Sequence, residues 1–117
     1  DTFTAYIDST IGASYFCKTM EKHNRTYKFN IWDTAGQEKY SCLVPLYYRN
    51  CDVALVVYDI TNKCSYEKAL SNVKELRERS DVEVILLIGN KSDMFKERTV
   101  TIQEATIFCR ENNIYMY

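Results

Sequence analysis

Apolar and polar positions along the chain form patterns that predict strands alternating with helices. Residues 27–32 alternate between apolar and polar side chains and predict a strand, and residues 13–20 predict its partner across a polar turn at 21–25, which is typical of a hairpin. The short connection makes these two strands antiparallel. Two near-continuous apolar runs, at 53–58 and 82–88, predict buried strands, and the first is expected to be covered on both faces.

Two later segments carry the spacing and the start signal of helices. A helix over 65–78 would place five apolar residues on one face, namely Tyr66, Ala69, Leu70, Val73 and Leu76. Thr101 and Glu104 have the spacing of a capping box, with Thr101 as the N-cap and Glu104 at the third helical position. That helix is expected to run to about Asn112, and a further strand is expected to begin within 114–117.

This alternation predicts one α/β domain over residues 1–117, since the length allows one domain with a real core but not two. The predicted architecture is a mostly parallel sheet with an antiparallel hairpin at one edge and helices on both faces. Ligands of such sheets bind at the carboxyl ends of the strands. Asp33 and the residues after Ile88 both lie at predicted strand ends.

Charge and cysteine content exclude several classes of function. The formal net charge is −1, which offers no electrostatic case for binding nucleic acid or an anionic membrane surface. The five cysteines are scattered and His23 is the one histidine, so a metal site built on sulfur is not expected. Scattered thiols suit a reducing, cytosolic setting. The chain starts at Asp1 without a methionine and stops at Tyr117 in an apolar run, so both ends are expected to be cut.

The stretch 32–38, Trp-Asp-Thr-Ala-Gly-Gln-Glu, carries the chemistry of a phosphate–metal site. Asp33 can hold a hard cation directly or through water, because carboxylates are suitable oxygen ligands. Gly36 lets its backbone N–H approach an anionic oxygen without a Cβ in the way. Gln37 can donate to and accept from a water aimed at a phosphorus atom. From Asp-x-x-Gly alone, a strand that ends in a glycine turn remains the alternative.

The stretch 89–93, Gly-Asn-Lys-Ser-Asp, directly follows a predicted strand and carries the chemistry of guanine recognition. The Asp93 carboxylate can accept two parallel hydrogen bonds from the N1–H and the exocyclic amine of guanine. Adenine lacks that donor pair and would leave the carboxylate unpaired. Lys91 can lay its methylene stem over the base, and Asn90 can tie neighbouring loops together. Taken alone, the segment could equally be a polar turn.

In this order the motifs resemble the Rab family of the Ras superfamily of small GTPases. Residues 9–12 resemble its switch I, 33–38 the start of its switch II, and 90–93 its guanine motif. Residues 11–15 are most similar to the endosomal branch. The resemblance implies a Ras-like P-loop NTPase fold and a switch that hydrolyses GTP to GDP and regulates vesicle and endosomal trafficking.

The resemblance also implies roles for particular residues. Thr10 would bind Mg²⁺ through its hydroxyl and the γ-phosphate through its N–H, although a plain loop threonine is the alternative. Asp33 would contact the groups that bind Mg²⁺ directly, without binding the ion itself. Gly36 would contact the γ-phosphate, and Gln37 would position the attacking water. The guanine base would be held by Asn90, Lys91 and Asp93.

Partners are implied by the same resemblance. Effectors would be bound by Ile11 and by an aromatic triad of Tyr15, Trp32 and Tyr47, for which core packing is the alternative. Tyr15 stands where the family usually has phenylalanine, and its hydroxyl could alter effector choice. An exchange factor and a GTPase-activating protein are further expected partners. The cytosolic face of endosomal or other vesicle membranes is the expected location.

Several of the family's parts have no counterpart in these residues. The phosphate cradle Gly-x-x-x-x-Gly-Lys-Ser/Thr is absent, because none of the three glycines precedes a lysine. The strand before it and the helix after it, the last helix and the prenylated cysteine tail are missing as well. We therefore expect a partial G domain that is itself inactive, within a GTP-hydrolysing parent. The alternative is a nucleotide-free interaction module that uses Tyr15, Trp32 and Tyr47.

Overall fold

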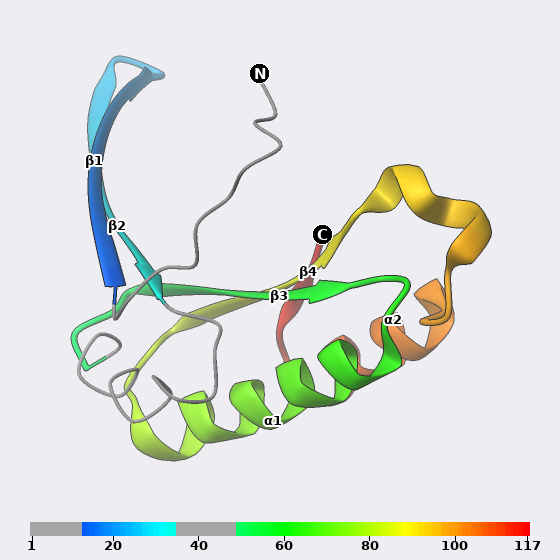
Figure 1. The fold of residues 1–117 in the computed structure, drawn as a ribbon. Coiled ribbons are helices and arrows are strands. Elements are labelled where there is room, and N and C mark those ends of the chain that lie inside the picture. The colour runs from blue at the N-terminus through cyan, green and yellow to red at the C-terminus, as the bar shows by residue number, and fades with distance from the viewer. Residues whose placement is uncertain (1–12, 35–48) are drawn as a thin grey trace. The chain divides into compact units, whose positions relative to one another are not determined.

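The computed structural model describes residues 13–34 and 49–117, which belong to two compact units (Figure 1). The first unit contains a hairpin, and the second an α/β arrangement. The elements in chain order are β1 (Ala13–Lys22), β2 (Arg25–Thr34), β3 (Val53–Asp59), α1 (Lys63–Arg79), β4 (Val84–Asn90), η2 (Ser92–Glu97), α2 (Ile102–Glu111) and β5 (Tyr115–Met116). Within these residues, each helix is too short or too polar to cross a membrane.

β1 and β2 form the predicted antiparallel hairpin, but both strands are longer than their apolar patterns. Their register runs from Ala13 opposite Thr34 to Lys22 opposite Arg25. The predicted turn at 21–25 is therefore wrong, and the turn is limited to His23 and Asn24. Both residues have positive φ, 51° and 58°, as a two-residue turn that follows the strand twist requires. The residues at these strand ends are polar or charged, so the apolar pattern did not indicate that the strands extend to them.

The two faces of the hairpin differ in chemistry. Strand alternation places an apolar stripe on one face, formed by Phe16, Met20, Tyr27, Phe29 and Ile31. The opposite face is mainly polar, and its aromatic exception is the cross-strand pair of Tyr15 and Trp32. The stripe is the face suited to a core, so Tyr15 and Trp32 lie on the side suited to solvent or a partner.

The second unit contains a parallel sheet of three strands in the order β3-β4-β5. This confirms the predicted parallel sheet, and the hairpin is antiparallel as predicted, while its predicted place at an edge of that sheet stays a prediction. β4 starts two residues later than the apolar run predicts. The run begins earlier than the strand because Val82, which precedes the strand, is also buried in the core. It also continues through Gly89 and Asn90, which pair with Tyr58 and Asp59. The segment predicted to follow the strand thus begins inside it.

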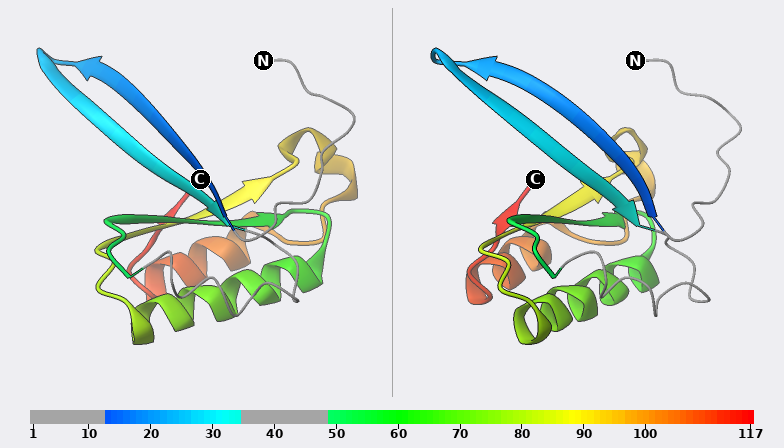
Figure 2. Two further views of the ribbon diagram at one scale, coloured as in Figure 1. Left: turned by 60° about the vertical axis from the view of Figure 1, so that its left-hand side comes forward. Right: turned by 90° about the vertical axis from the view of Figure 1, so that its left-hand side faces the viewer.

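α1 and α2 lie on the same face of this sheet (Figure 2). Their buried side chains join a single core with alternate residues of β3 and β4, such as Val56 and Leu87. The predicted apolar face of α1 is confirmed, with Tyr66, Ala69, Val73 and Leu76 buried and Leu70 packed at the edge of the core. The ring of Tyr66 meets that of Tyr58 edge-on, with centroids 5.0 Å apart.

The other face of the sheet is open within the described residues. Val53, Leu55 and Val57 are 48%, 60% and 54% exposed, and they alternate with the buried residues of β3. The expectation that this run is covered on both faces is therefore not met by the part of the chain that the structure describes. An apolar run shows that both faces favour burial, but it does not show which segment supplies the cover.

Both helices begin at side-chain caps. Thr101 accepts a hydrogen bond from the N–H of Glu104 at 3.1 Å, which confirms the predicted cap. The Glu104 carboxylate contacts the ammonium of Lys63 at 2.6 Å and so links the two helices. α1 begins two residues earlier than predicted, because the side chain of Asn62 accepts from the N–H of Ser65 at 3.1 Å and caps the helix.

Gly89 lies against the core with no room for a side chain. A Cβ there would be 3.0 Å from Ile60 Cγ2 and 3.1 Å from the Tyr58 hydroxyl oxygen. We expect Gly89→Ala to lower the free energy of unfolding by roughly 1–3 kcal/mol, as overpacking of a core typically does. Urea denaturation measures this. Ser71→Ala on the exposed side of α1 is the control, expected to change stability by about 0.5 kcal/mol or less. Equal effects of the two variants would contradict the packing argument.

Candidate functional site

The predicted site residues fall into three groups. Asn90, Lys91 and Asp93 lie in the α/β unit, and Tyr15, Trp32 and Asp33 lie in the hairpin. The remaining ones, Thr10, Ile11, Gly36, Gln37 and Tyr47, lie outside the described residues and stay predictions. The first two groups are described separately, each within its own unit.

The turn after β4 is held in a defined shape by its own backbone and by Asn90. Asn90 is the last residue of β4, and its carbonyl oxygen accepts from the N–H of Ile60 at 3.2 Å. Its side-chain oxygen accepts from the N–H of Lys91 at 2.9 Å. Lys91 adopts the left-handed conformation, with φ 63° and ψ 40°, and its carbonyl accepts from the N–H of Met94 at 2.9 Å. Asn90 therefore stabilises a strained turn.

Asp93 is placed by this turn at the start of the 3₁₀ helix η2, which the sequence pattern did not predict. Its side chain is exposed, and the described part of the chain offers its carboxylate no hydrogen bond or ion pair. Both oxygens can therefore accept from a ligand. This pair of acceptors fits guanine, which presents two adjacent N–H donors, whereas adenine has no matching pair of donors.

Asp59 is a polar residue of this site that the sequence analysis missed. It ends β3, opposite Asn90 in the register, and its carboxylate lies 2.8 Å from the ammonium nitrogen of Lys91. The N–H and hydroxyl of Thr61 donate to its other oxygen at 2.8 and 2.7 Å. The hydrogen bonds from Lys91 and Thr61 lower its pKa to about 2, so Asp59 is ionised at neutral pH. The Asp-x-Thr order after a strand was the available signal, since aspartate favours such turns.

The end of β3 is anchored to the start of α1. The N–H of Asp59 donates to the hydroxyl oxygen of Ser65 at 3.0 Å, and the N–H of Asn62 donates to the carbonyl of Asp59 at 3.0 Å. The carbonyl of Ile60 accepts from the N–H groups of Thr99 and Val100 at 2.9 and 3.1 Å. The carboxyl ends of β3 and β4 thus form a rigid polar edge that ends in the turn at Asn90.

The hairpin carries the second group of predicted residues near its open end. The rings of Tyr15 and Trp32 are tilted against each other with centroids 4.9 Å apart, and each residue is 51% exposed. The Tyr15 hydroxyl donates to the side-chain oxygen of Asn30 at 2.8 Å. Asp33 is exposed near the carboxyl end of β2, on the same face as the apolar stripe. The role of the Tyr15–Trp32 pair in binding effectors stays a prediction.

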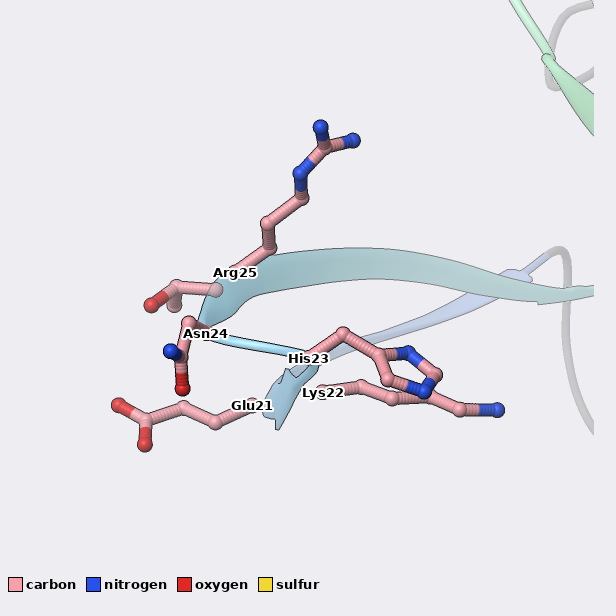
Figure 3. A pocket seen from close by; sticks show the side chains of 6 residues that line it. Glu21, Lys22, His23, Asn24 and Arg25 are labelled. Carbon is pink, nitrogen blue, oxygen red and sulfur yellow. The ribbon is translucent and has the colours of Figure 1, made fainter.

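A hollow at the hairpin turn does not form a ligand site. It is lined by consecutive residues of the turn and the adjoining strand ends, namely Glu21, Lys22, His23, Asn24, Arg25 and Thr26. The labelled side chains point in different directions and do not converge on a common point (Figure 3). Their mixed charges also offer no single type of ligand a matching surface.

Known proteins are similar to the chain along its length. The model of the Ras family matches residues 1–117. Ras-related protein RABF2a of Arabidopsis thaliana is 43% identical over 116 residues, which are 98% of this chain and 58% of that protein. Ras-related protein Rab5A of Oryza sativa subsp. japonica is 45% identical over 114 residues, which are 97% of this chain and 56% of that protein.

The chain therefore spans less than two thirds of the length of these relatives. Within that span, the exposed Asp93 and the ordered turn of Asn90 and Lys91 supply a geometry suited to guanine. The family match covers all of the chain, and the relatives bear the Rab-type names that its motifs predict. The chain belongs to the Ras family of small GTPases, and it is of the Rab type.

Proposed function

We propose that the protein carrying this chain binds guanine nucleotide, hydrolyses GTP to GDP and acts as a switch in endosomal trafficking. The observation that carries the proposal is the turn after β4, which holds Lys91 and leaves the Asp93 carboxylate exposed at the carboxyl edge of a parallel sheet. Membership of the Ras family and similarity to Rab5A support the same function. Association with the cytosolic face of endosomal membranes is part of the proposal and would require a lipid-modified tail.

Base choice would rest on Asp93. A carboxylate that pairs with both N–H groups of guanine is left unpaired by adenine, which costs roughly 1–3 kcal/mol. Asn90 would act through the backbone, because its side-chain oxygen is already occupied by the N–H of Lys91. Lys91 would contribute its stem, since its side chain is half exposed beside the turn.

Hydrolysis would rest on Asp33 in the hairpin and on Thr10, Gly36 and Gln37, which lie outside the described ranges. Thr10 and Asp33 would hold Mg²⁺, which on binding neutralises charge that develops on the phosphate oxygens. Gly36 would contact the γ-phosphate, and Gln37 would orient the attacking water. Because this chemistry is positioning plus charge stabilisation, hydrolysis is expected to be slow until a partner supplies an arginine, which adds roughly 10³–10⁵ in rate.

Effector binding would use the polar face of the hairpin. Tyr15 and Trp32 are the two aromatic residues on this otherwise mainly polar face. Their rings contact each other, and each residue is about half exposed. Rigid aromatic pairs make good anchors at protein interfaces. This observation also supports the second candidate, a nucleotide-free interaction module that uses the same face. The hydroxyl of Tyr15 is committed to Asn30, so any effect on effector choice would include that pair.

Competition binding tests the proposed function. Labelled GDP is bound to the protein that carries this chain and displaced with unlabelled GDP, GTP, ADP or ATP. We expect displacement by the guanine nucleotides at concentrations at least tenfold lower than by the adenine nucleotides, since 1.4 kcal/mol is a factor of ten. Failure to bind any nucleotide would favour the interaction module instead.

Gln37→Leu is expected to slow intrinsic hydrolysis by about tenfold or more while GTP affinity stays near that of the wild type. Leucine fills similar space but cannot orient water, so about 1.4 kcal/mol or more of barrier lowering is lost. Single-turnover phosphate release measures the rate. Gln103→Leu in α2 is the matched control and should leave the rate unchanged. Hydrolysis at the wild-type rate by Gln37→Leu would exclude Gln37 from positioning the water.

A further inference from the structure

The carboxylate of Asp59 is fixed by its own turn. Its Oδ1 accepts two hydrogen bonds from Thr61, one from the N–H and one from the hydroxyl, at 2.8 and 2.7 Å. Its backbone N–H is held by the hydroxyl oxygen of Ser65 at 3.0 Å. The side chain is only 20% exposed. The position of Oδ2 is therefore fixed by the end of β3 and the start of α1, independently of the turn after β4.

Lys91 is held at both ends of its side chain. At the backbone, its N–H donates to the side-chain oxygen of Asn90 at 2.9 Å, and its left-handed conformation directs the chain into η2. At the tip, its ammonium nitrogen lies 2.8 Å from Oδ2 of Asp59. The side chain as a whole is nevertheless 51% exposed. The methylene stem between the two fixed ends is therefore ordered and accessible.

We infer that Asp59 is a positioning residue for the guanine nucleotide: it orders the side chain of Lys91 so that the stem forms one wall of the base site. This inference rests on the proposed function. A free lysine loses side-chain freedom when a base packs on it, whereas a lysine that is already ordered loses less. That difference corresponds to roughly two- to tenfold in the dissociation constant.

A double-mutant cycle separates this role from a general contribution to the fold. The dissociation constant for GDP is measured for the wild type, Asp59→Asn, Lys91→Met and the double variant, in the protein that carries this chain. Asparagine keeps an oxygen that can accept from Thr61 but loses the charge that holds Lys91. We expect Asp59→Asn to weaken GDP binding about two- to tenfold, and to have no further effect in the Lys91→Met background.

Two further variants control for stability. Glu104→Gln removes a carboxylate from another ion pair, 2.6 Å from Lys63, and should leave the affinity for GDP unchanged. Thr61→Val removes only one of the two hydrogen bonds to Oδ1, so it should keep the fold and give a smaller loss than Asp59→Asn. It therefore tests the inference even if Asp59→Asn fails to fold.

The outcomes distinguish the inference from the proposed function. Equal losses for Asp59→Asn in both backgrounds, or unchanged affinity in a guanine-selective protein, would overturn the role of Asp59 and leave the function standing. A wild-type protein that does not prefer guanine would overturn the proposed function itself. A loss that depends on Lys91, with Glu104→Gln unchanged, would support both.

Discussion

Asp93→Asn is expected to weaken the binding of GDP and GTP by roughly ten- to a hundredfold and to reduce the preference for guanine over adenine. The carboxylate of Asp93 is exposed and has no partner among the described residues, so its hydrogen bonds to a base would replace bonds to water alone. Asparagine keeps one acceptor but presents an amine toward one of the two N–H groups of guanine. The loss of one hydrogen bond to a charged group corresponds to roughly 1.5–3 kcal/mol.

The measurement is competition among GTP, ATP and xanthosine triphosphate. Xanthine carries an oxygen where guanine carries the exocyclic amine, so the amide of the variant can donate to it. We expect Asp93→Asn to gain affinity for xanthosine triphosphate while it loses affinity for GTP. Glu97→Gln, an exposed carboxylate in the last turn of η2, is the control and should keep the wild-type order. Unchanged guanine selectivity in Asp93→Asn would remove Asp93 from base recognition.

Local patterns in the sequence predicted the features that depend on near neighbours in the chain. The helical spacing of Tyr66, Val73 and Leu76 fixed the buried face of α1, because residues three and four apart share a helix face. The Thr101 cap followed from the same local geometry. The ends of the elements were predicted less well, since charged residues such as Lys22 and Arg25 continue a strand without adding to its apolar pattern.

Features that depend on the pairing of distant segments could not be predicted in this way. The ion pair between Asp59 and Lys91 arises because β3 and β4 pair in a register that brings Asp59 opposite Asn90. Local sequence patterns do not predict the register between two strands that are distant in the chain. The exposed face of Leu55 has the same origin, because its apolarity indicates burial and says nothing about the covering segment.

A protein made of residues 1–117 alone is expected not to bind GTP tightly and not to hydrolyse it. These residues contain no Gly-x-x-x-x-Gly-Lys-Ser/Thr segment, whose N–H groups, lysine and hydroxyl would contact the phosphates and the metal. Asp33 and Gly36 cannot replace those groups. Each lost charge-assisted hydrogen bond removes roughly 1.5–3 kcal/mol. Three such losses weaken binding by about 10³-fold or more.

Packing points to the same result for this chain. The strands of the described residues form two separate sheets, and the apolar side chains of Val53, Leu55 and Val57 are 48% to 60% exposed. Open sheet edges and exposed apolar faces favour association. We therefore expect residues 1–117 alone to be unstable, aggregated or dependent on a partner.

Calorimetry of the 117-residue chain with GTP and Mg²⁺ is the direct test, together with light scattering to establish its state of association. We expect no heat of binding at micromolar nucleotide, whether the chain is monomeric or associated. Aggregated chain with no binding would agree with both arguments, and a stable monomer with no binding would support the phosphate argument alone. A stable monomer with a micromolar or tighter dissociation constant would show that Asp93, Lys91 and the residues near Asp33 suffice without a phosphate cradle.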